Sequence, residues 1–284
     1  MSASDPRRYA FENKIGKEKL VMNKDSDSVL SVSKQNNIVH LVLNRPSVLN
    51  ALNSALLDLL KDELASIKEN RAIQGVIITG MGEQAFSAGA DIEYLSNASP
   101  LQVRELAKKA ISVNSQIENL GKPVIALING FALGGGLELA ESCMLRIAVS
   151  TAKLGHPEVK IGAVAGWGGT TRLPRLIGKS RATEMLLTGK IITANEAMQI
   201  GLVNRVVEPE YLQSEGEKIL NEILSNAPVA VQFSWEALHR GLNLSIEESA
   251  KLGVDYFGLV ASTKDFKEGT KSFIKKQKPK YKGE

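Results

Sequence analysis

Three short runs of β-branched residues, separated by helical patterns, limit the fold of this 284-residue chain more than any other feature. The runs cover residues 38–43, 74–79 and 123–128, and each ends at a turn residue. Between the first two, apolar residues recur at helical spacing through residues 51–70, and a helix that begins at Ser99 leads into the third. Strands that alternate with helices indicate an α/β core.

The pattern changes after residue 180, where helical periods replace the strand signals. Thr193, with Glu196 three residues later, predicts a capped helix that ends at Gly201. Further helices are expected at residues 209–226, 228–240 and 245–261. We therefore divide the chain into an N-terminal extension (1–28), an α/β core with the candidate site (29–190) and an all-helical C-terminal part (191–284).

The composition is that of a globular protein from a reducing compartment. With 43% hydrophobic residues the chain can bury a sizeable core. The single cysteine, Cys143, excludes a disulfide framework within the chain. No apolar run approaches the roughly 18 to 20 residues that span a bilayer, and the first residues lack the apolar centre of a signal peptide. We therefore expect a cytoplasmic protein without a membrane segment.

The formal net charge of +4 comes largely from lysines near the C-terminus, namely Lys264, Lys267, Lys271, Lys275, Lys276, Lys278, Lys280 and Lys282. Such a run forms a solvated helix face, a nucleic-acid patch or a contact for a phosphorylated ligand. A solvated face is the commonest of the three. The aromatic residues between the lysines are few and better explained by packing, so nucleic acid is not expected as a partner.

Three segments rich in glycine stand out, at residues 87–91, 134–136 and 162–169. Glycine allows close approach of the backbone, and a helix that begins after it points free N–H groups outward. Such places bind anions or stabilise negative charge that develops on an oxygen. None of the three matches a dinucleotide-binding fingerprint or a P-loop, so a nucleotide phosphate is not indicated.

Two glutamates accompany these glycines. Glu138 follows the glycines of 134–136 and lies between two leucines, and Glu158 comes further along the chain. Two carboxyls in one apolar pocket would have pKa values that differ, so that one acts as a base and the other as an acid. A glutamate in the first turn also stabilises its helix through the dipole, and spacing alone leaves both readings open. The three histidines show no metal-ligand spacing.

Taken in order, the motifs resemble the enoyl-CoA hydratase (crotonase) family. The similar segments run from about residue 30 to the end of the chain and comprise residues 44–46, 49–52, 86–91 (FSAGAD), 129–140 (NGFALGGGLELA), 156–158 (HPE), 166–175 (GWGGTTRLPR) and 193–204. The resemblance implies an α/β fold built as a spiral of β-β-α units, with a helical C-terminal part that forms trimers, which often pair as hexamers.

The resemblance also implies roles for particular residues. It assigns acid and base catalysis to Glu138 and Glu158, an oxyanion hole to the backbone N–H groups of Ala90 and Gly135, and the positioning of water to Gly166. It makes substrate-binding candidates of Ala88, Asp91, Ile92, Tyr94, Leu95, Trp167, Phe257 and Lys276, of which the last two would contact the CoA of a neighbouring subunit. For Trp167 a plain packing role is an equal alternative.

The implied activity is hydration of 2-enoyl-CoA thioesters in fatty acid β-oxidation, with Glu138 as the base on water and Glu158 as the proton donor to C2. No metal or cofactor is implied, because CoA is part of the substrate. Alternatives are an isomerase or a specialised dehydratase of the same family and, from another class, an RNA-binding relative. Two departures from the family pattern, Ser47-Val48 and Ala165, leave one CoA phosphate contact and the acyl preference open.

Overall fold

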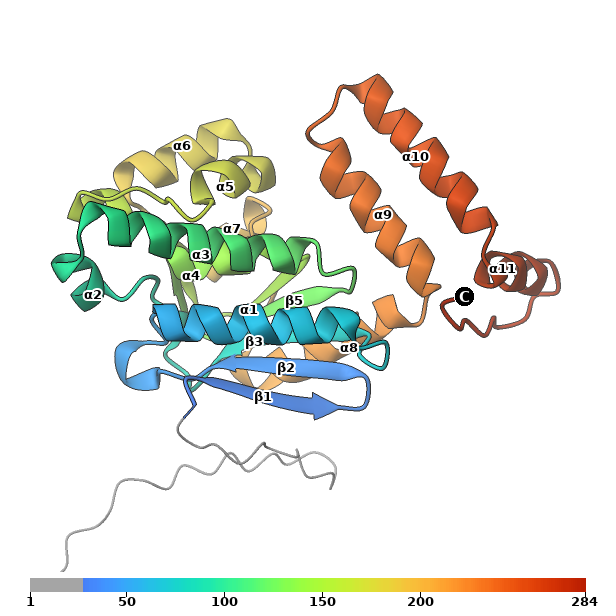
Figure 1. Ribbon diagram of the computed structural model, residues 1–284, viewed down its shortest axis with the longest axis horizontal. Helices are drawn as coiled ribbons and strands as arrows, with labels where there is room; N and C mark the ends of the chain where they lie inside the picture. The colour runs from blue at the N-terminus through green and yellow to red at the C-terminus, as the bar shows by residue number, and fades with distance from the viewer. Residues whose placement is uncertain (1–27) are drawn as a thin grey trace, which may run out of the picture.

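The computed structural model describes residues 28–284, and the expected N-terminal extension lies outside them except for Ser28 (Figure 1). Ten strands form two sheets. The larger sheet has the order β1 (Leu30–Gln35), β2 (Ile38–Leu43), β3 (Gly75–Gly80), β5 (Val124–Ile128), β7 (Leu145–Val149), β10 (Arg205–Val207). The smaller has the order β4 (Ala85–Ser87), β6 (Phe131–Leu133), β8 (Lys153–Gly155), β9 (Ile191–Thr193).

From β3 to β8, consecutive strands alternate between the two sheets, and this alternation makes the fold a spiral. β3, β5 and β7 pair in parallel in the larger sheet, and the strand that follows each of them, β4, β6 or β8, pairs in parallel in the smaller sheet. A helix follows each such pair of strands. The expected α/β fold of β-β-α units is therefore confirmed.

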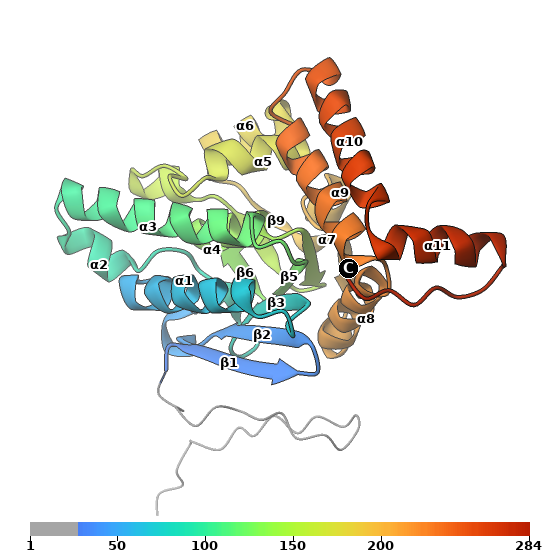
Figure 2. The same cartoon turned by 45° about the vertical axis from the view of Figure 1, so that its right-hand side comes forward.

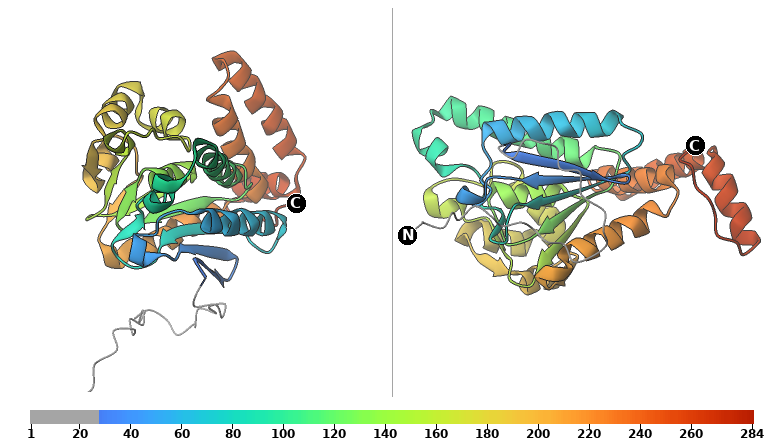
Figure 3. Two further views of the ribbon diagram at one scale, coloured as in Figure 1. Left: turned by 60° about the vertical axis from the view of Figure 1, so that its left-hand side comes forward. Right: turned by 90° about the horizontal axis from the view of Figure 1, so that it is seen from below.

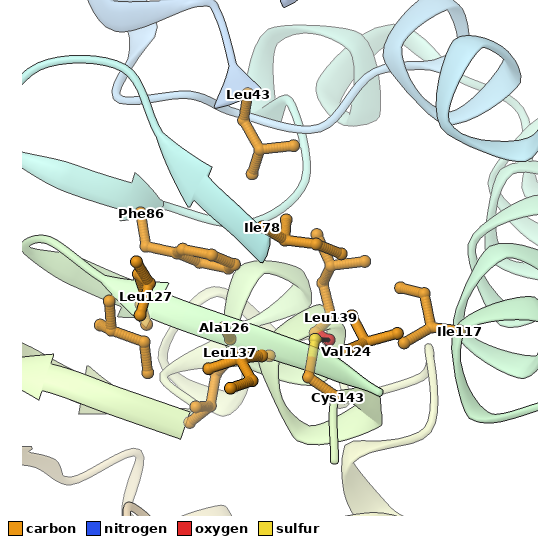
Figure 4. Packing of buried hydrophobic residues seen from close by; sticks show 14 of the residues in the cluster. Leu43, Ile78, Phe86, Ile117, Val124, Ala126, Leu127, Leu137, Leu139 and Cys143 are labelled. Carbon is orange, nitrogen blue, oxygen red and sulfur yellow. Dashed lines mark hydrogen bonds between the residues drawn. The ribbon is translucent and has the colours of Figure 1, made fainter. Parts of the chain in front are cut away.

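Helices α1 (Ser54–Glu69) and α3 (Pro100–Glu118) pack side by side in front of the larger sheet (Figure 1). Both carry the apolar stripes that the sequence predicts, and α3 begins with a capping box of Ser99 and Gln102. The short helix α4 (Gly135–Ser142) is buried along its whole length. Its Leu137 and Leu139 lie among core residues of the strands (Figure 4).

Four further helices are α2 (Ile92–Asn97), α5 (Gly169–Ile177), α6 (Lys179–Thr188) and α7 (Ala194–Gln199), of which α5 packs on α4. The capping box of Thr193 and Glu196 at the start of α7 is confirmed. Three single turns of 3-10 helix occur at η1 (Pro46–Val48), η2 (Glu158–Ile161) and η3 (Pro209–Tyr211).

The C-terminal helices are α8 (Leu212–Leu224), α9 (Pro228–Gly241), α10 (Ile246–Ala261) and α11 (Lys264–Ile274). α8 packs on β5 and β7, whereas α9 and α10 form a hairpin beside the core and α11 projects from it (Figures 2 and 3). The lysine-rich run thus begins as a helix, and the segment after it folds back, because Asp265 accepts hydrogen bonds from the N–H groups of Lys282 and Gly283.

The expectation of an all-helical part after residue 190 is wrong at two places. β9 pairs with β8 and β10 pairs with β7, so both sheets continue into this part. Each of these strands has three residues, too few for a period of two to be seen beside the helical signals that flank them. Among the described residues, no helix is both long enough and apolar enough to cross a membrane.

Candidate active site

The glycine-rich turn before α4 is held in place by contacts that leave no space for side chains. Gly134 has a φ of +50°, and a Cβ at this position would lie 3.1 Å from Oε1 of Glu158. A Cβ on Gly136 would collide with the carbonyl oxygen of Ser87 at the end of β4. The glycines therefore allow β4, α4 and η2 to meet at one point.

The same turn lies against the segment that contains Ala90. Gly89 has a φ of +100°, and a Cβ on it would lie 3.2 Å from the backbone nitrogen of Gly135. Within residues 28–284, neither the N–H of Ala90 nor that of Gly135 donates a hydrogen bond to the protein. The structure thus brings together two segments whose backbone donors suit an oxygen that carries developing negative charge.

Glu138 lies in the first turn of α4 and is only 1% exposed. Its Oε1 accepts hydrogen bonds from the N–H groups of Trp167, at 2.8 Å, and Gly169, at 2.7 Å. Burial raises the pKa of Glu138 to about 7, although the Gly169 N–H and the charge of His156 act in the opposite direction. A carboxyl with this pKa can take up and release a proton near neutral pH.

Glu158 begins η2 on the other side of the glycine turn. Its side chain is nearly buried, and neither carboxyl oxygen has a hydrogen-bond partner among the described residues. Nδ1 of His156 lies 3.5 Å from its Oε1. The carboxyl therefore keeps its hydrogen-bonding capacity for a group that enters the site.

His156 and Glu141 belong to this site as well, although the sequence motifs assign them no role. Nε2 of His156 lies 2.9 Å from Oε1 of Glu141, and both side chains are fully buried. Burial alone would lower the pKa of His156, but Glu141 and Glu158 raise it to about 10. One signal was available, because Glu141 follows Glu138 by three residues and so shares its helix face.

Trp167 has the packing role considered for it, and its backbone also contacts the site. The indole is nearly buried, and a Cβ on Gly135 would lie 2.6 Å from two of its ring carbons. Its carbonyl oxygen accepts a hydrogen bond from the Asn114 side chain. Gly166 lies in the exposed turn just before it, and Glu138 is held by Trp167 and Gly169 rather than by Gly166.

The other substrate-binding candidates near the core lie between the end of β4 and the middle of α2, where Ala88 and Leu95 are half-buried. Asp91 caps α2 and forms an ion pair with Arg45 at 3.0 Å, whereas Ile92 and Tyr94 are exposed. Asp91 and Tyr94 line a cavity of about 500 Å³ between α1, α2 and α3. Neither glutamate of the pair lines this cavity, so the structure does not join it to the candidate active site.

The candidates for CoA contact lie on the C-terminal helices, at a distance from the glutamates along the chain. Phe257 is on α10, 69% exposed, and its ring meets Phe266 edge-on. Lys276 follows α11 and is exposed, with a φ of +54°. The hydrogen bonds and ion pair of Glu138 and Glu158 within the described residues involve Trp167, Gly169 and His156 instead. In the same part of the chain, no group of three His, Cys, Asp or Glu side chains could hold a metal ion.

Known proteins resemble the chain along most of its length. It is 44% identical to crotonyl-CoA hydratase of Syntrophomonas wolfei over 250 residues, 88% of this chain and 96% of the relative. It is 42% identical to short-chain-enoyl-CoA hydratase of Clostridium acetobutylicum over 247 residues, 87% of this chain and 95% of the relative. The crystal structure of an enoyl-CoA hydratase from Bacillus anthracis superposes with a TM-score of 0.87 at 40% identity, covering 90% of this chain and all of the other.

The family model of enoyl-CoA hydratase/isomerase matches residues 33–284. That range includes every strand from β2 onward and the second half of β1, together with the glycine turn, the two glutamates and all of the C-terminal helices. The resemblance found in the sequence motifs is thereby confirmed. The chain belongs to the enoyl-CoA hydratase/isomerase family.

Proposed function

We infer that this protein is an enoyl-CoA hydratase, a hydro-lyase that adds water across the C2–C3 double bond of 2-enoyl-CoA to give 3-hydroxyacyl-CoA. The observation that carries this assignment is the approach of two glutamates, Glu138 and Glu158, to one glycine turn that presents backbone N–H groups. The two relatives described above are hydratases of crotonyl-CoA and of short-chain enoyl-CoA. From these relatives we propose that the substrate of this protein also has a short acyl chain.

Each residue has a distinct part in the proposed reaction. The thioester oxygen accepts hydrogen bonds from the N–H groups of Ala90 and Gly135, which stabilise the enolate-like state by a few kcal/mol. Glu138 takes a proton from the water whose oxygen attacks C3. Glu158 gives a proton to C2, so that one molecule of water is added in total.

The surroundings of Glu138 support its role as the base. Oε1 is occupied by two backbone N–H groups, which leaves Oε2 for the water. With a pKa of about 7, the carboxyl is ionised in a large fraction of molecules at neutral pH. An isomerase needs one carboxyl to move a proton between two carbons, whereas hydration uses two, so the pair of glutamates favours hydration over the isomerase alternative.

Three further properties are part of this proposal. The enzyme works without a metal or other cofactor, so treatment with a chelator leaves hydration unchanged. It assembles as a trimer or a hexamer, and it acts in the cytoplasm. The single cysteine, Cys143, is buried and burial raises its pKa to about 12, which agrees with an unreactive thiol.

The test follows the absorbance of the conjugated enoyl thioester with 2-enoyl-CoA substrates of increasing chain length. Glu138→Gln and Glu158→Gln each lower kcat/KM by about 10²–10⁴-fold, as expected for the loss of a general acid or base. Glu248→Gln on α10 is the matched control, because it changes an exposed carboxyl that pairs with Lys251, and it keeps wild-type activity. Full hydration by Glu138→Gln, or none by the wild type, would contradict the assignment.

A further inference from the structure

A buried line of three side chains ends at the proposed acid. It runs from Glu141 on α4 through His156 to Glu158 on η2, with 2.9 Å between Glu141 Oε1 and His156 Nε2 and 3.5 Å between His156 Nδ1 and Glu158 Oε1. The side chains of Glu141 and His156 are fully buried. The proposed hydration uses only Glu158, so the other two residues remain to be explained.

Glu141 has His156 as its hydrogen-bond partner. Its Oε1 contacts Nε2 of His156, and its Oε2 has no hydrogen-bond partner among the described residues. The nearby Arg146 is committed elsewhere, since it donates to the carbonyl oxygens of Leu202 and Cys143. A buried carboxylate with a single imidazole partner favours the protonated, positively charged imidazole.

The imidazole is also fixed in orientation. A Cβ on Gly169 would lie 2.8 Å from Cε1 of His156, so the first residue of α5 closes the space beside the ring. With Nε2 directed to Glu141, Nδ1 is left to face Glu158 at 3.5 Å and has no closer hydrogen-bond partner among the described residues. The ring cannot turn away without losing its contact with Glu141.

We propose that His156, held by Glu141, is a positioning residue that orients the Glu158 carboxyl and places its imidazole beside Glu138. This inference rests on the proposed hydratase function. When Glu158 gives its proton to C2 it becomes a carboxylate in a nearly buried place, and the N–H of His156 is the donor that faces it. His156 keeps its own proton throughout, and Glu158 regains a proton from solvent while Glu138 releases the one it took from water.

The charged groups around His156 agree with this role. Glu138 and Glu141 act on it from α4 and Glu158 from η2. Arg146 on β7 interacts with the charge of Glu141, and Arg172 on α5, which is paired with Glu118, interacts with Glu141 and Glu138. His156 lowers the pKa of Glu138 more strongly than Glu158 or Glu141 raises it. Loss of the positive charge therefore makes Glu138 harder to ionise.

The test compares His156→Gln with the double variant Glu141→Gln/His156→Gln. The single change leaves Glu141 buried without a cation and lowers stability, whereas the double change removes both charges and preserves folding. In both, kcat falls about tenfold with little change in KM, because an interaction made during proton transfer is lost. The pH at which kcat/KM rises also increases, by about one pH unit in the single variant and by less in the double variant.

A measurement on the wild type completes the test. The NMR signals of the His156 imidazole are recorded in protein labelled at histidine and are assigned with the His40→Gln and His239→Gln variants. They should remain those of the charged ring up to about pH 9. A neutral ring at pH 7 overturns the proposal. A folded double variant that has the kcat and pH profile of the wild type also overturns the proposal, because Glu141 and His156 would then have a purely structural role. A failure of the proposed hydratase function would look different from a failure of this proposal, because the wild type would then hydrate no 2-enoyl-CoA.

Discussion

Glu138 is buried where a carboxylate is poorly solvated, and this has opposite effects on catalysis and on folding. Burial raises the pKa of Glu138 from 4.5 to about 7 in the folded protein. The folded state therefore binds this proton more tightly than the unfolded state does. Below pH 4.5 the group has no effect on the pH dependence of stability, and between pH 4.5 and 7 stability falls as the pH rises.

Replacement of Glu138 by glutamine should stabilise the protein at alkaline pH. Glutamine carries no charge and its oxygen can still accept the hydrogen bonds from Trp167 and Gly169. At pH 8 the free energy of unfolding should increase by up to about 3 kcal/mol, and at pH 4 it should change little. Denaturant unfolding at the two pH values measures the difference, with Glu248→Gln as the control. Equal effects at both pH values would show that Glu138 is ionised without penalty.

Among individual residues, the sequence predicts the two glutamates of the candidate site but not the contact between His156 and Glu141, and the reason is physical. Glu138 and Glu158 stand in motifs, and the structure places both beside the glycine turn, while their catalytic role stays a prediction. His156 and Glu141 are separated by a strand pair, and their contact depends on how β7 and β8 return the chain to α4. Nothing local in the sequence reveals that contact.

The first turn of α4 illustrates how an element is fitted to its neighbours. Gly135 is its first residue, and the Trp167 indole from the loop before α5 lies directly against it. Any side chain at position 135 would force the indole or the turn to move. The N–H of Trp167 would move with it, and this group holds Glu138.

Gly135→Ala should therefore lower both stability and hydration. A Cβ 2.6 Å from two ring carbons requires a shift of the indole, and overpacking of this kind typically reduces the free energy of unfolding by about 1–3 kcal/mol. The matched control is Gly253→Ala on α10, where the Cβ meets no atom within 4 Å. The control should gain about 0.5–1 kcal/mol from helix propensity. Thermal unfolding and the enoyl absorbance assay measure both effects, and equal behaviour of the two variants would contradict the steric explanation.

Long elements are predicted from the sequence better than short ones. α1, α3, α9 and α10 carry several turns of apolar periodicity, and their expected spans agree closely with the structure. The strands of the smaller sheet have three residues each, so they show no period and are defined only by partners distant in the sequence. The spiral topology follows from the family resemblance rather than from periodicity, because it depends on those distant pairings.

At the scale of the molecule, exposed apolar side chains are densest, among residues 28–284, on the C-terminal helices and the turns between them. Those in this part are Leu238, Leu242, Leu244, Ile246, Val254, Phe257, Leu259, Phe273 and Ile274. α9 and α10 form a hairpin beside the core and α11 projects from it (Figures 2 and 3), so no part of residues 28–284 covers this apolar surface. Surfaces of this kind mark contacts between proteins, which supports the proposed self-association.

The protein should therefore sediment as a trimer or a hexamer at micromolar concentration. Phe273→Glu, at a side chain that is 86% exposed, should lower the assembled mass, because a charge would be buried in the contact. Leu101→Glu, at an exposed position on α3, is the control and should leave the mass unchanged. Sedimentation of the wild type as a monomer would contradict the proposal.

The position of Trp167 also gives the protein an optical reporter. The chain has two tryptophans; Trp235 stacks on His239 in α9, whereas the Trp167 indole lies on Gly135 beside the candidate oxyanion hole. In a Trp235→Phe variant all tryptophan fluorescence would come from position 167. Its emission wavelength and quenching would then register the arrival of a thioester at the glycine turn, separately from the loss of enoyl absorbance that reports the addition of water.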